Sequence, residues 1–174
     1  MSTVDLETAR LILRPHTVED FEDYFAYIMD PELKRMLGLN GVVDRGSAQE
    51  TFQWLLDNVE FIAVVSKDSG KVIGHVCIHP PIDKVVDDGT FAGKRGASIT
   101  FAIAKQEQRK GLMLEALQCL IVQMFQEGVD YIDCEYTPDN AASRGLQEKL
   151  GFQYWGVEQF GDEEIIINIL QDPN

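Results

Sequence analysis

The 174-residue sequence has little positive charge. It contains 15 Lys and Arg residues against 29 Asp and Glu residues, which gives a formal net charge of −14. This balance argues against binding to nucleic acid or to an anionic membrane, and it favours encounter with cationic partners such as amines. Long apolar runs are also absent, and the first 20 residues carry several acidic side chains. We therefore expect no signal peptide, no membrane span and a cytoplasmic protein.

Cysteine pairs and metal-ligand spacings are absent as well. The three cysteines show no C-x-x-C spacing and lie within apolar patterns, which predicts buried thiols in a reducing compartment: Cys77, Cys119 and Cys134. Of the three histidines only His75 and His79 are close in sequence, and in a strand they would lie about 13 Å apart. The sequence therefore predicts no metal site.

The common nucleotide-binding loops are missing too, because neither G-x-x-x-x-G-K-[ST] nor G-x-G-x-x-G occurs. A basic turn, Gln108-Arg109-Lys110-Gly111-Leu112-Met113, instead joins a strand-like run to an amphipathic run that reaches about Gln126. Free N–H groups and the helix dipole attract anions at a helix start, and Gly111 allows close backbone approach. This pattern favours phosphate binding, and a solvated helix start without a ligand is the alternative.

The element order predicts one domain over residues 1–174. Strands are expected at Arg10–Arg14, Phe61–Ser66, Val72–Ile78, Ala97–Ala104, Tyr131–Tyr136, Phe152–Phe160 and Ile165–Leu170. Capping boxes, Thr17 with Asp20 and Ser47 with Glu50, open two helices, and further helices are expected at Pro31–Leu37, from Gln108 and at Ala141–Leu150. We expect a long mobile loop at Pro80–Arg95. This order indicates an α/β (α+β) fold that mixes antiparallel hairpins with one β-α-β crossover.

Three separated segments, in this order, resemble the GNAT acyl-CoA-dependent N-acetyltransferases, specifically the ribosomal-protein-type (RimJ/RimL-like) branch. Thr8–Pro15 looks like the first strand of that branch, and Gln108–Met113 looks like its acetyl-CoA pyrophosphate loop. Pro138–Ser143, followed by Glu148–Phe152, is similar to the turn and helix beside the pantetheine arm. The resemblance implies a mixed, mostly antiparallel central sheet, flanked by helices and splayed between its fourth and fifth strands, with pantetheine in the gap.

The resemblance also implies which residues bind acetyl-CoA. Backbone groups of Phe101, Ala102 and Ile103 would bind pantetheine, and the turn would receive the pyrophosphate through Gln108, Arg109, Lys110, Gly111, Leu112 and Met113. Asn140 would hydrogen-bond near the pantetheine, and Ser143 would protonate the leaving thiolate. Read without the resemblance, Asn140 is a helix N-cap and Ser143 an ordinary first-turn residue.

The implied reaction is direct acetyl transfer from acetyl-CoA to a primary amine, without a metal. Candidate general bases are Glu135, Asp133 and His75, with Glu135 chosen as the catalytic residue. Met113 stands where the family has Gly or Ala, and Ser98 where this branch often has a carboxylate. These two departures motivate the alternative of a noncatalytic acyl-CoA-binding or interaction module.

The acceptor amine is not identified by the sequence. The acceptor site would be lined by Met29–Gly46 and Tyr154–Glu163, whose acidic side chains would suit a cationic amine. We expect either a monomer or a homodimer.

Overall fold

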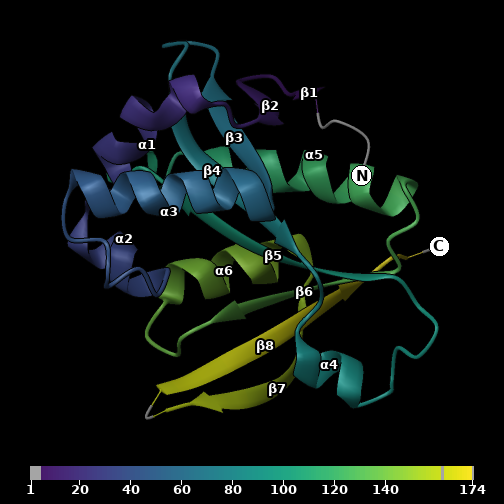
Figure 1. Ribbon diagram of the computed structural model, residues 1–174. Coiled ribbons are helices and arrows are strands. Elements are labelled where there is room, and N and C mark those ends of the chain that lie inside the picture. Colours follow the sequence, from purple (N-terminus) through teal and green to yellow (C-terminus); the bar gives the residue numbers. More distant parts are fainter. Residues whose placement is uncertain (1–4, 162, 174) are drawn as a thin grey trace. The chain divides into compact units, whose positions relative to one another are not determined.

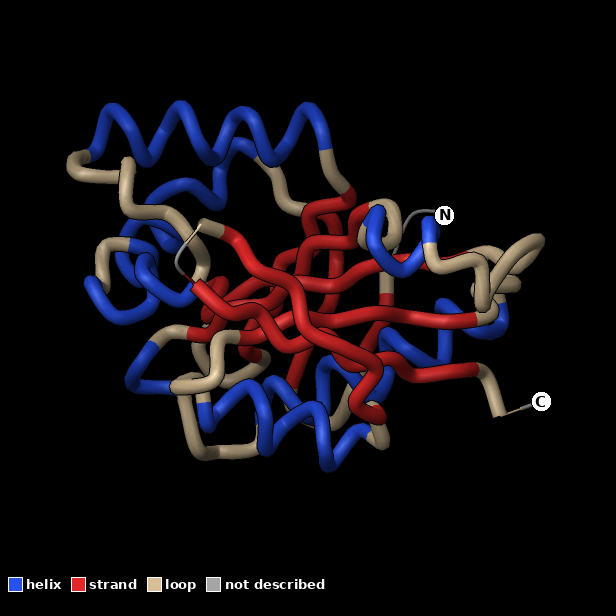
Figure 2. Tube along the Cα trace, turned by 90° about the horizontal axis from the view of Figure 1, so that it is seen from below, coloured by secondary structure: helices blue, strands red, loops and turns tan. Residues whose placement is uncertain are grey.

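The computed structural model describes residues 5–161 and 163–173. Two compact units are present: one contains residues up to Cys77 with Phe101–Cys119, and the other contains Ile78–Thr100 with the residues from Leu120 onward. The chain passes between the units within β4 (Val72–His79), β5 (Gly96–Ile103) and α5 (Leu112–Gln126). Short strands and helices are interspersed along the chain (Figure 2).

In the first unit, neighbouring strands follow the order β1-β2-β3-β4 and then the last residues of β5. The bounds are Leu6–Glu7 for β1, Leu11–Pro15 for β2 and Glu60–Ser66 for β3. β2 is antiparallel to both β1 and β3, with Leu13 opposite Val64. The predicted first strand and the predicted β3–β4 hairpin are therefore confirmed, and the Gly70 N–H to Ser66 carbonyl bond of 2.8 Å lies in the hairpin turn.

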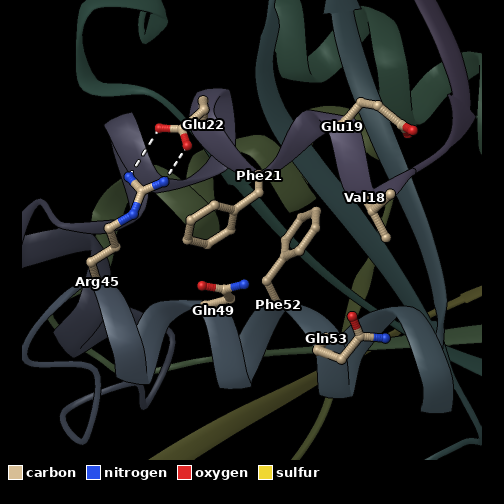
Figure 3. A pocket seen from close by; sticks show the side chains of 8 residues that line it. All are labelled: Val18, Glu19, Phe21, Glu22, Arg45, Gln49, Phe52 and Gln53. Carbon is tan, nitrogen blue, oxygen red and sulfur yellow. Dashed lines mark hydrogen bonds and ion pairs between the residues drawn. The ribbon is translucent and has the colours of Figure 1, made fainter.

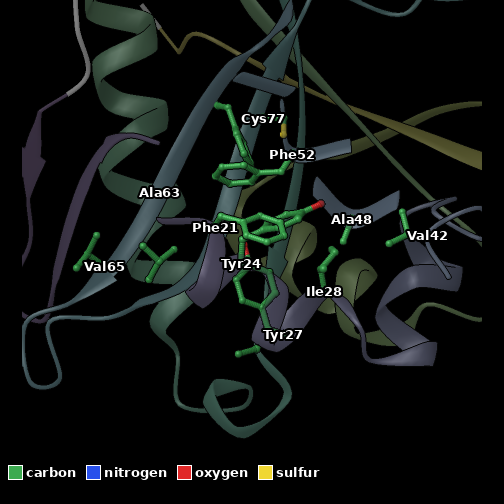
Figure 4. Close-up of a cluster of buried hydrophobic side chains, with 13 residues drawn as sticks. Phe21, Tyr24, Tyr27, Ile28, Val42, Ala48, Phe52, Ala63, Val65 and Cys77 are labelled. Carbon is green, nitrogen blue, oxygen red and sulfur yellow. The ribbon is translucent and has the colours of Figure 1, made fainter. Parts of the chain in front are cut away.

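The helices of the first unit are η1 (Val18–Asp20), α1 (Phe21–Ile28), α2 (Pro31–Met36), α3 (Arg45–Asn58), η2 (Lys105–Glu107) and the start of α5. α1 and α3 lie side by side (Figure 1). Their apolar faces pack with β3 and β4 into one core, which includes Tyr24, Phe52, Ala63 and Cys77 (Figure 4). Burial of these side chains is the main term that stabilises this unit.

The second unit contains the start of β5, α4 (Asp83–Asp87), β6 (Tyr131–Tyr136), α6 (Ala141–Leu150), β7 (Gln153–Phe160) and β8 (Glu163–Gln171). Its strand order is β5-β6-β8-β7, and only β5 and β6 are parallel, over the pairs from Gly96–Tyr131 to Ser98–Asp133. The Tyr131 ring stacks on Phe91 at 4.3 Å and would clash with any Cβ at Gly96. This close approach explains a glycine within a strand.

Two predicted helix starts were wrong. α3 begins at Arg45 after the N-cap Asp44, so Ser47 is its third helical residue and not its cap. Asp44 Oδ1 accepts from the Ser47 N–H over 2.8 Å, while Ser47 Oγ accepts from the Asp44 N–H over 3.0 Å. Asp caps a helix as well as Ser does, so the box forms one turn earlier. α5 begins at Leu112, after the turn, and not at Gln108.

The prediction of a loop over Pro80–Arg95 was also wrong in part. The segment contains α4, and Val85 and Phe91 are buried in an apolar cluster with Tyr131, Ile167 and Ile169. The Ile82 N–H donates to Asp133 Oδ2 over 3.1 Å. These tertiary contacts order a segment whose composition alone suggests a loop. Asp162, expected in the β7–β8 turn, lies outside the described residues.

Candidate active site

The turn between η2 and α5 has an unusual backbone. Arg109 has a φ of +63° and Gly111 a φ of +75°, and Arg109 is the only non-glycine residue with positive φ among the described residues. Left-handed residues within a turn bring successive backbone N–H groups to one side, where they form a concave site for an anion. The cost of a left-handed Arg, about 1–2 kcal/mol, fits a conformation held for binding.

The turn leads directly into the N-terminus of α5. The Glu115 N–H donates to the Gly111 carbonyl over 3.1 Å, so the N–H groups of the residues before it, Leu112 to Leu114, have no helical acceptor. The side chains of Leu112 and Met113 are buried. Met113 therefore packs inward and leaves the surface of the turn open. Free donors and the helix dipole make this turn chemically suited to phosphate.

The polar side chains of the turn lie at its surface. Gln108, Arg109 and Lys110 are exposed. Gln108 Nε2 donates to the Ile103 carbonyl over 3.3 Å, and Lys110 Nζ pairs with Glu107 Oε2 at 3.0 Å. The Gln108 contact ties the turn to the end of β5.

The end of β5 lies close against β4 in the first unit. Ala102 is buried, Phe101 and Ile103 are partly buried, and the Ala104 N–H donates to the Ile73 carbonyl over 2.8 Å. An added Cβ at Gly74 would overlap the Ala102 carbonyl oxygen. Glycine is therefore required at position 74 for this approach of the two strands.

In the second unit, Asn140 and Ser143 occupy the first turn of α6. Asn140 is the N-cap, and its Oδ1 accepts from the Ser143 N–H over 3.0 Å. The Ser143 hydroxyl is buried and accepts from Gln147 Nε2 over 3.1 Å, while Gln147 Oε1 accepts from Asn168 Nδ2 over 3.0 Å. The described residues supply no acceptor for the Ser143 proton, so this hydroxyl is arranged to donate to a further group.

The two acidic residues of β6 differ in their environment. Asp133 is fully buried, its register partner on β5 is Ser98, and burial raises its pKa to about 6. Its Oδ1 has no hydrogen-bond partner among the described residues. Glu135 is exposed, and its pKa is raised by desolvation and by repulsion from Asp133 and Glu158. Both carboxyls are therefore easier to protonate than free ones, as a general base near neutral pH must be.

His75 is a core residue of the first unit. It is buried, its Nδ1 lies 2.7 Å from the Tyr27 hydroxyl, and burial lowers its pKa to about 3. This environment suits a neutral histidine that satisfies a buried tyrosine, and it argues against a role for His75 as a base. Among residues 5–161 and 163–173, no group of three or more His, Cys, Asp or Glu side chains is arranged to hold a metal ion.

A groove of about 270 Å³ lies between η1, α1 and α3 (Figure 3). Arg45 pairs with Glu22 at its edge and covers the ring of Phe21 at 5.0 Å. Phe52 and Gln53 lie on the α3 side. The groove lies outside every segment predicted to bind acetyl-CoA.

Comparison with known proteins identifies the family. A family model described as an acetyltransferase (GNAT) domain matches residues 10–153. The chain belongs to the GNAT acetyltransferase family. This GNAT chain is 30% identical over 158 residues to YoaA, an uncharacterized N-acetyltransferase of Bacillus subtilis (strain 168), with 87% of this chain and 84% of YoaA covered.

Solved GNAT structures share the fold. A GNAT-family acetyltransferase from Bacillus anthracis superposes with a TM-score of 0.82 at 17% identity, covering 97% of this chain and 98% of that one. A ribosomal-protein-S5-alanine acetyltransferase from Vibrio fischeri superposes with a TM-score of 0.75 at 18% identity, covering 98% of each chain. The predicted GNAT fold, with helices flanking a mostly antiparallel sheet, is confirmed.

Several contacts around the predicted GNAT residues were not found from the sequence. Gln147 and Asn168 support Ser143, Asp133 meets Ser98, and Arg10 meets the basic turn. Gln147 and Ser143 lie one turn apart in α6, whereas the contacts of Asn168, Asp133 and Arg10 each join two different elements. The spacing within one element does not reveal such pairs.

No helix in the described part of the chain is long and apolar enough to cross a bilayer.

Proposed function

We propose that the protein transfers the acetyl group of acetyl-CoA to a primary amine, either the α-amine of a protein or an amine of a small molecule. The family supports acetyl transfer. The observation that supports acetyl-CoA as the acetyl donor is the left-handed turn at Arg109 and Gly111, which precedes the free N–H groups of α5. A pyrophosphate matches this set of backbone donors.

The proposed roles follow the chemistry of each group. The N–H groups from Arg109 to Met113 bind the pyrophosphate, and backbone groups of Phe101–Ile103 bind pantetheine. When bound, acetyl-CoA supplies the thioester: a C–N bond to the amine forms, the C–S bond breaks, the amine loses a proton and the sulfur gains one. Ser143 gives its proton to the sulfur, Asn140 holds the Ser143 backbone, and Glu135 takes the amine proton.

Two electrostatic features support an amine as the acetyl acceptor. A chain with a net charge of −14 attracts cationic amines, and the partly desolvated Glu135 suits removal of an ammonium proton. The structurally similar Vibrio fischeri protein is a ribosomal-protein-S5-alanine acetyltransferase, which favours a ribosomal-protein-type acceptor as the first to be tested. A cytoplasmic location and a monomer or homodimer belong to the same proposal. One family match spans both units, which supports a single functional domain.

The first test is the thermal unfolding midpoint with acetyl-CoA, CoA or ATP. At about a hundred times its dissociation constant a ligand stabilises by roughly 2.7 kcal/mol, a shift of several degrees. We expect shifts with acetyl-CoA and CoA but not with ATP, followed by release of free thiol when amine acceptors are added. Absence of any shift contradicts the donor assignment. Binding without thiol release from a broad amine panel would instead support a noncatalytic acyl-CoA-binding module.

A further inference from the structure

Arg10, just before β2, contacts the basic turn although 100 positions separate them in sequence. Its Nη1 donates to the Lys110 carbonyl over 2.9 Å, and its Nε donates to Glu115 Oε2 over 2.6 Å. The other oxygen of Glu115 accepts from Thr8 Oγ1 over 2.6 Å and from the Arg10 N–H over 2.9 Å. The segment Thr8–Arg10 thus holds both the last carbonyl before Gly111 and the first turn of α5.

Arg10 also changes the charge beside the turn. Burial alone would raise the pKa of Glu115, but hydrogen bonds from Thr8 and Arg10 lower it overall, so the carboxylate is ionised at neutral pH. An uncompensated carboxylate within the first turn of α5 would repel a phosphate. Its ion pair with Arg10 removes most of that repulsion.

One end of the guanidinium remains available at the turn. A Cβ placed on Gly111 would lie 3.7 Å from Arg10 Nη2, and this nitrogen has no hydrogen-bond partner among the described residues. Half of the Arg10 side chain is exposed. The planar guanidinium can therefore bridge Lys110 and Glu115 and still donate to an oxyanion beside Gly111, an arrangement that a lysine cannot copy.

We infer that Arg10 is a pyrophosphate-binding residue that also positions the turn. This inference rests on the proposed function, because it requires that the turn receives the pyrophosphate of acetyl-CoA. Arg10 holds the Lys110 carbonyl on one side of the turn, so that the neighbouring N–H groups stay on the other. Its free Nη2 donates to a pyrophosphate oxygen, and its pairing with Glu115 lowers repulsion of the ligand.

The test measures dissociation constants by calorimetry for wild type, Arg10→Met and Arg10→Lys. Three ligands are used: CoA, 3′-dephospho-CoA, which keeps the pyrophosphate, and pantetheine at millimolar concentration, which has no phosphate. Arg10→Met should weaken CoA and dephospho-CoA alike by about tenfold or more, because a hydrogen bond to a charged group is lost, and should leave pantetheine unchanged. Arg10→Lys should stay at least about threefold weaker than wild type, because it lacks the fork.

Arg45→Met is the matched control. Arg45 is a half-exposed arginine of the same unit that makes two hydrogen bonds to one glutamate, Glu22, and its replacement by Met changes the net charge by the same amount. Arg45 lies in the segment predicted to line the acceptor site, and the titration contains no acceptor, so only CoA binding is measured. Arg45→Met should leave CoA affinity unchanged. Circular dichroism and the unfolding midpoint verify that each variant is folded.

Each other result has a definite meaning. Wild type that binds none of the CoA ligands contradicts the proposed function itself. If wild type binds CoA, two results overturn the role of Arg10. In one, Arg10→Met binds CoA as tightly as wild type does; in the other, it loses as much affinity for pantetheine as for CoA. A loss confined to CoA would assign Arg10 to the 3′-phosphate and overturn the pyrophosphate contact. Full recovery in Arg10→Lys would contradict the bridging role.

Discussion

Gln147 Nε2 lies 3.1 Å from Ser143 Oγ, one helical turn away in α6. Because Gln147 Oε1 already accepts from Asn168, its amide presents N–H groups to the serine. The Ser143 oxygen is therefore an acceptor in this pair, and its proton remains free for another group. This polarity is what an acid that protonates a thiolate requires, so it can be tested by reversing it.

Gln147→Glu reverses the polarity with little change in shape. Above the pKa of the introduced carboxyl, the ionised side chain at position 147 would accept a hydrogen bond from the Ser143 hydroxyl instead of donating one to its oxygen. We expect kcat to fall at pH 8 toward the value of Ser143→Ala, which should be lower than wild type by about a hundredfold. The double variant should be no slower than Ser143→Ala alone. Independent, multiplying losses would show that Gln147 does not act through Ser143.

Asp133→Asn should stabilise the protein at alkaline pH. The pKa of Asp133 is raised to about 6 from 3.8, so the ionised form is disfavoured in the folded state, and wild type gains stability as pH falls from 6 toward 4. The neutral amide avoids burying a charge. Urea unfolding should give Asp133→Asn an advantage of about 1–3 kcal/mol at pH 8 that is much smaller at pH 4. An equal difference at both pH values would contradict this ionisation.

Glu135→Gln tests the general base. If Glu135 accepts the amine proton, the variant should lose about a hundredfold in kcat and lose the rise of kcat with pH that follows its ionisation. Thiol release measured from pH 5 to pH 9 follows both effects, with acetyl-CoA affinity as the control. Unchanged turnover would remove Glu135 from the mechanism. Asp133→Asn, measured in the same assay, would then lose turnover if Asp133, the other carboxyl of β6, is the general base.

Local sequence signals predicted the turn and most element ends. The helix Ala141–Leu150 was confirmed at both ends because Asn140 caps it and Gly151 closes it with a φ of +91°. The basic turn was predicted because its glycine and its charges lie within one hexapeptide. Such features depend only on residues a few positions apart, so they can be recognised without knowledge of the tertiary contacts.

Pairs of residues that meet only through the fold were not predictable in this way. Ser98 stands where the resembling branch often has a carboxylate, and the β5–β6 register places the carboxyl of Asp133 opposite it. A shift of one residue would turn Asp133 to the other face of the sheet. Val85 and Phe91 likewise gain their burial from tertiary contacts. The composition of Pro80–Arg95 contains no sign of those contacts.

His75 should make the protein less stable in acid. Its pKa is lowered to about 3 by burial, so below its unfolded value of 6.5 the unfolded chain takes up a proton that the folded chain does not. This group alone lowers the free energy of unfolding by up to about 1.4 kcal/mol per pH unit between pH 6.5 and 3. Gln at this position can still hydrogen-bond Tyr27. The stability difference between wild type and His75→Gln should therefore change with pH by that slope, and parallel curves would contradict the shift.

Gly74→Ala should disturb the end of β5 more than its small size suggests. Its Cβ would overlap the Ala102 carbonyl oxygen and come within 3.0 Å of the Ile103 Cα, so backbone must move. We expect a loss of about 1–3 kcal/mol in urea unfolding, and weaker acetyl-CoA binding, because Phe101–Ile103 are the proposed pantetheine contacts. Gly145→Ala is the matched control: it lies within α6 with open space around it and should stabilise by about 0.5–1 kcal/mol. Equal effects of the two substitutions would show that β4 does not constrain β5 at this point.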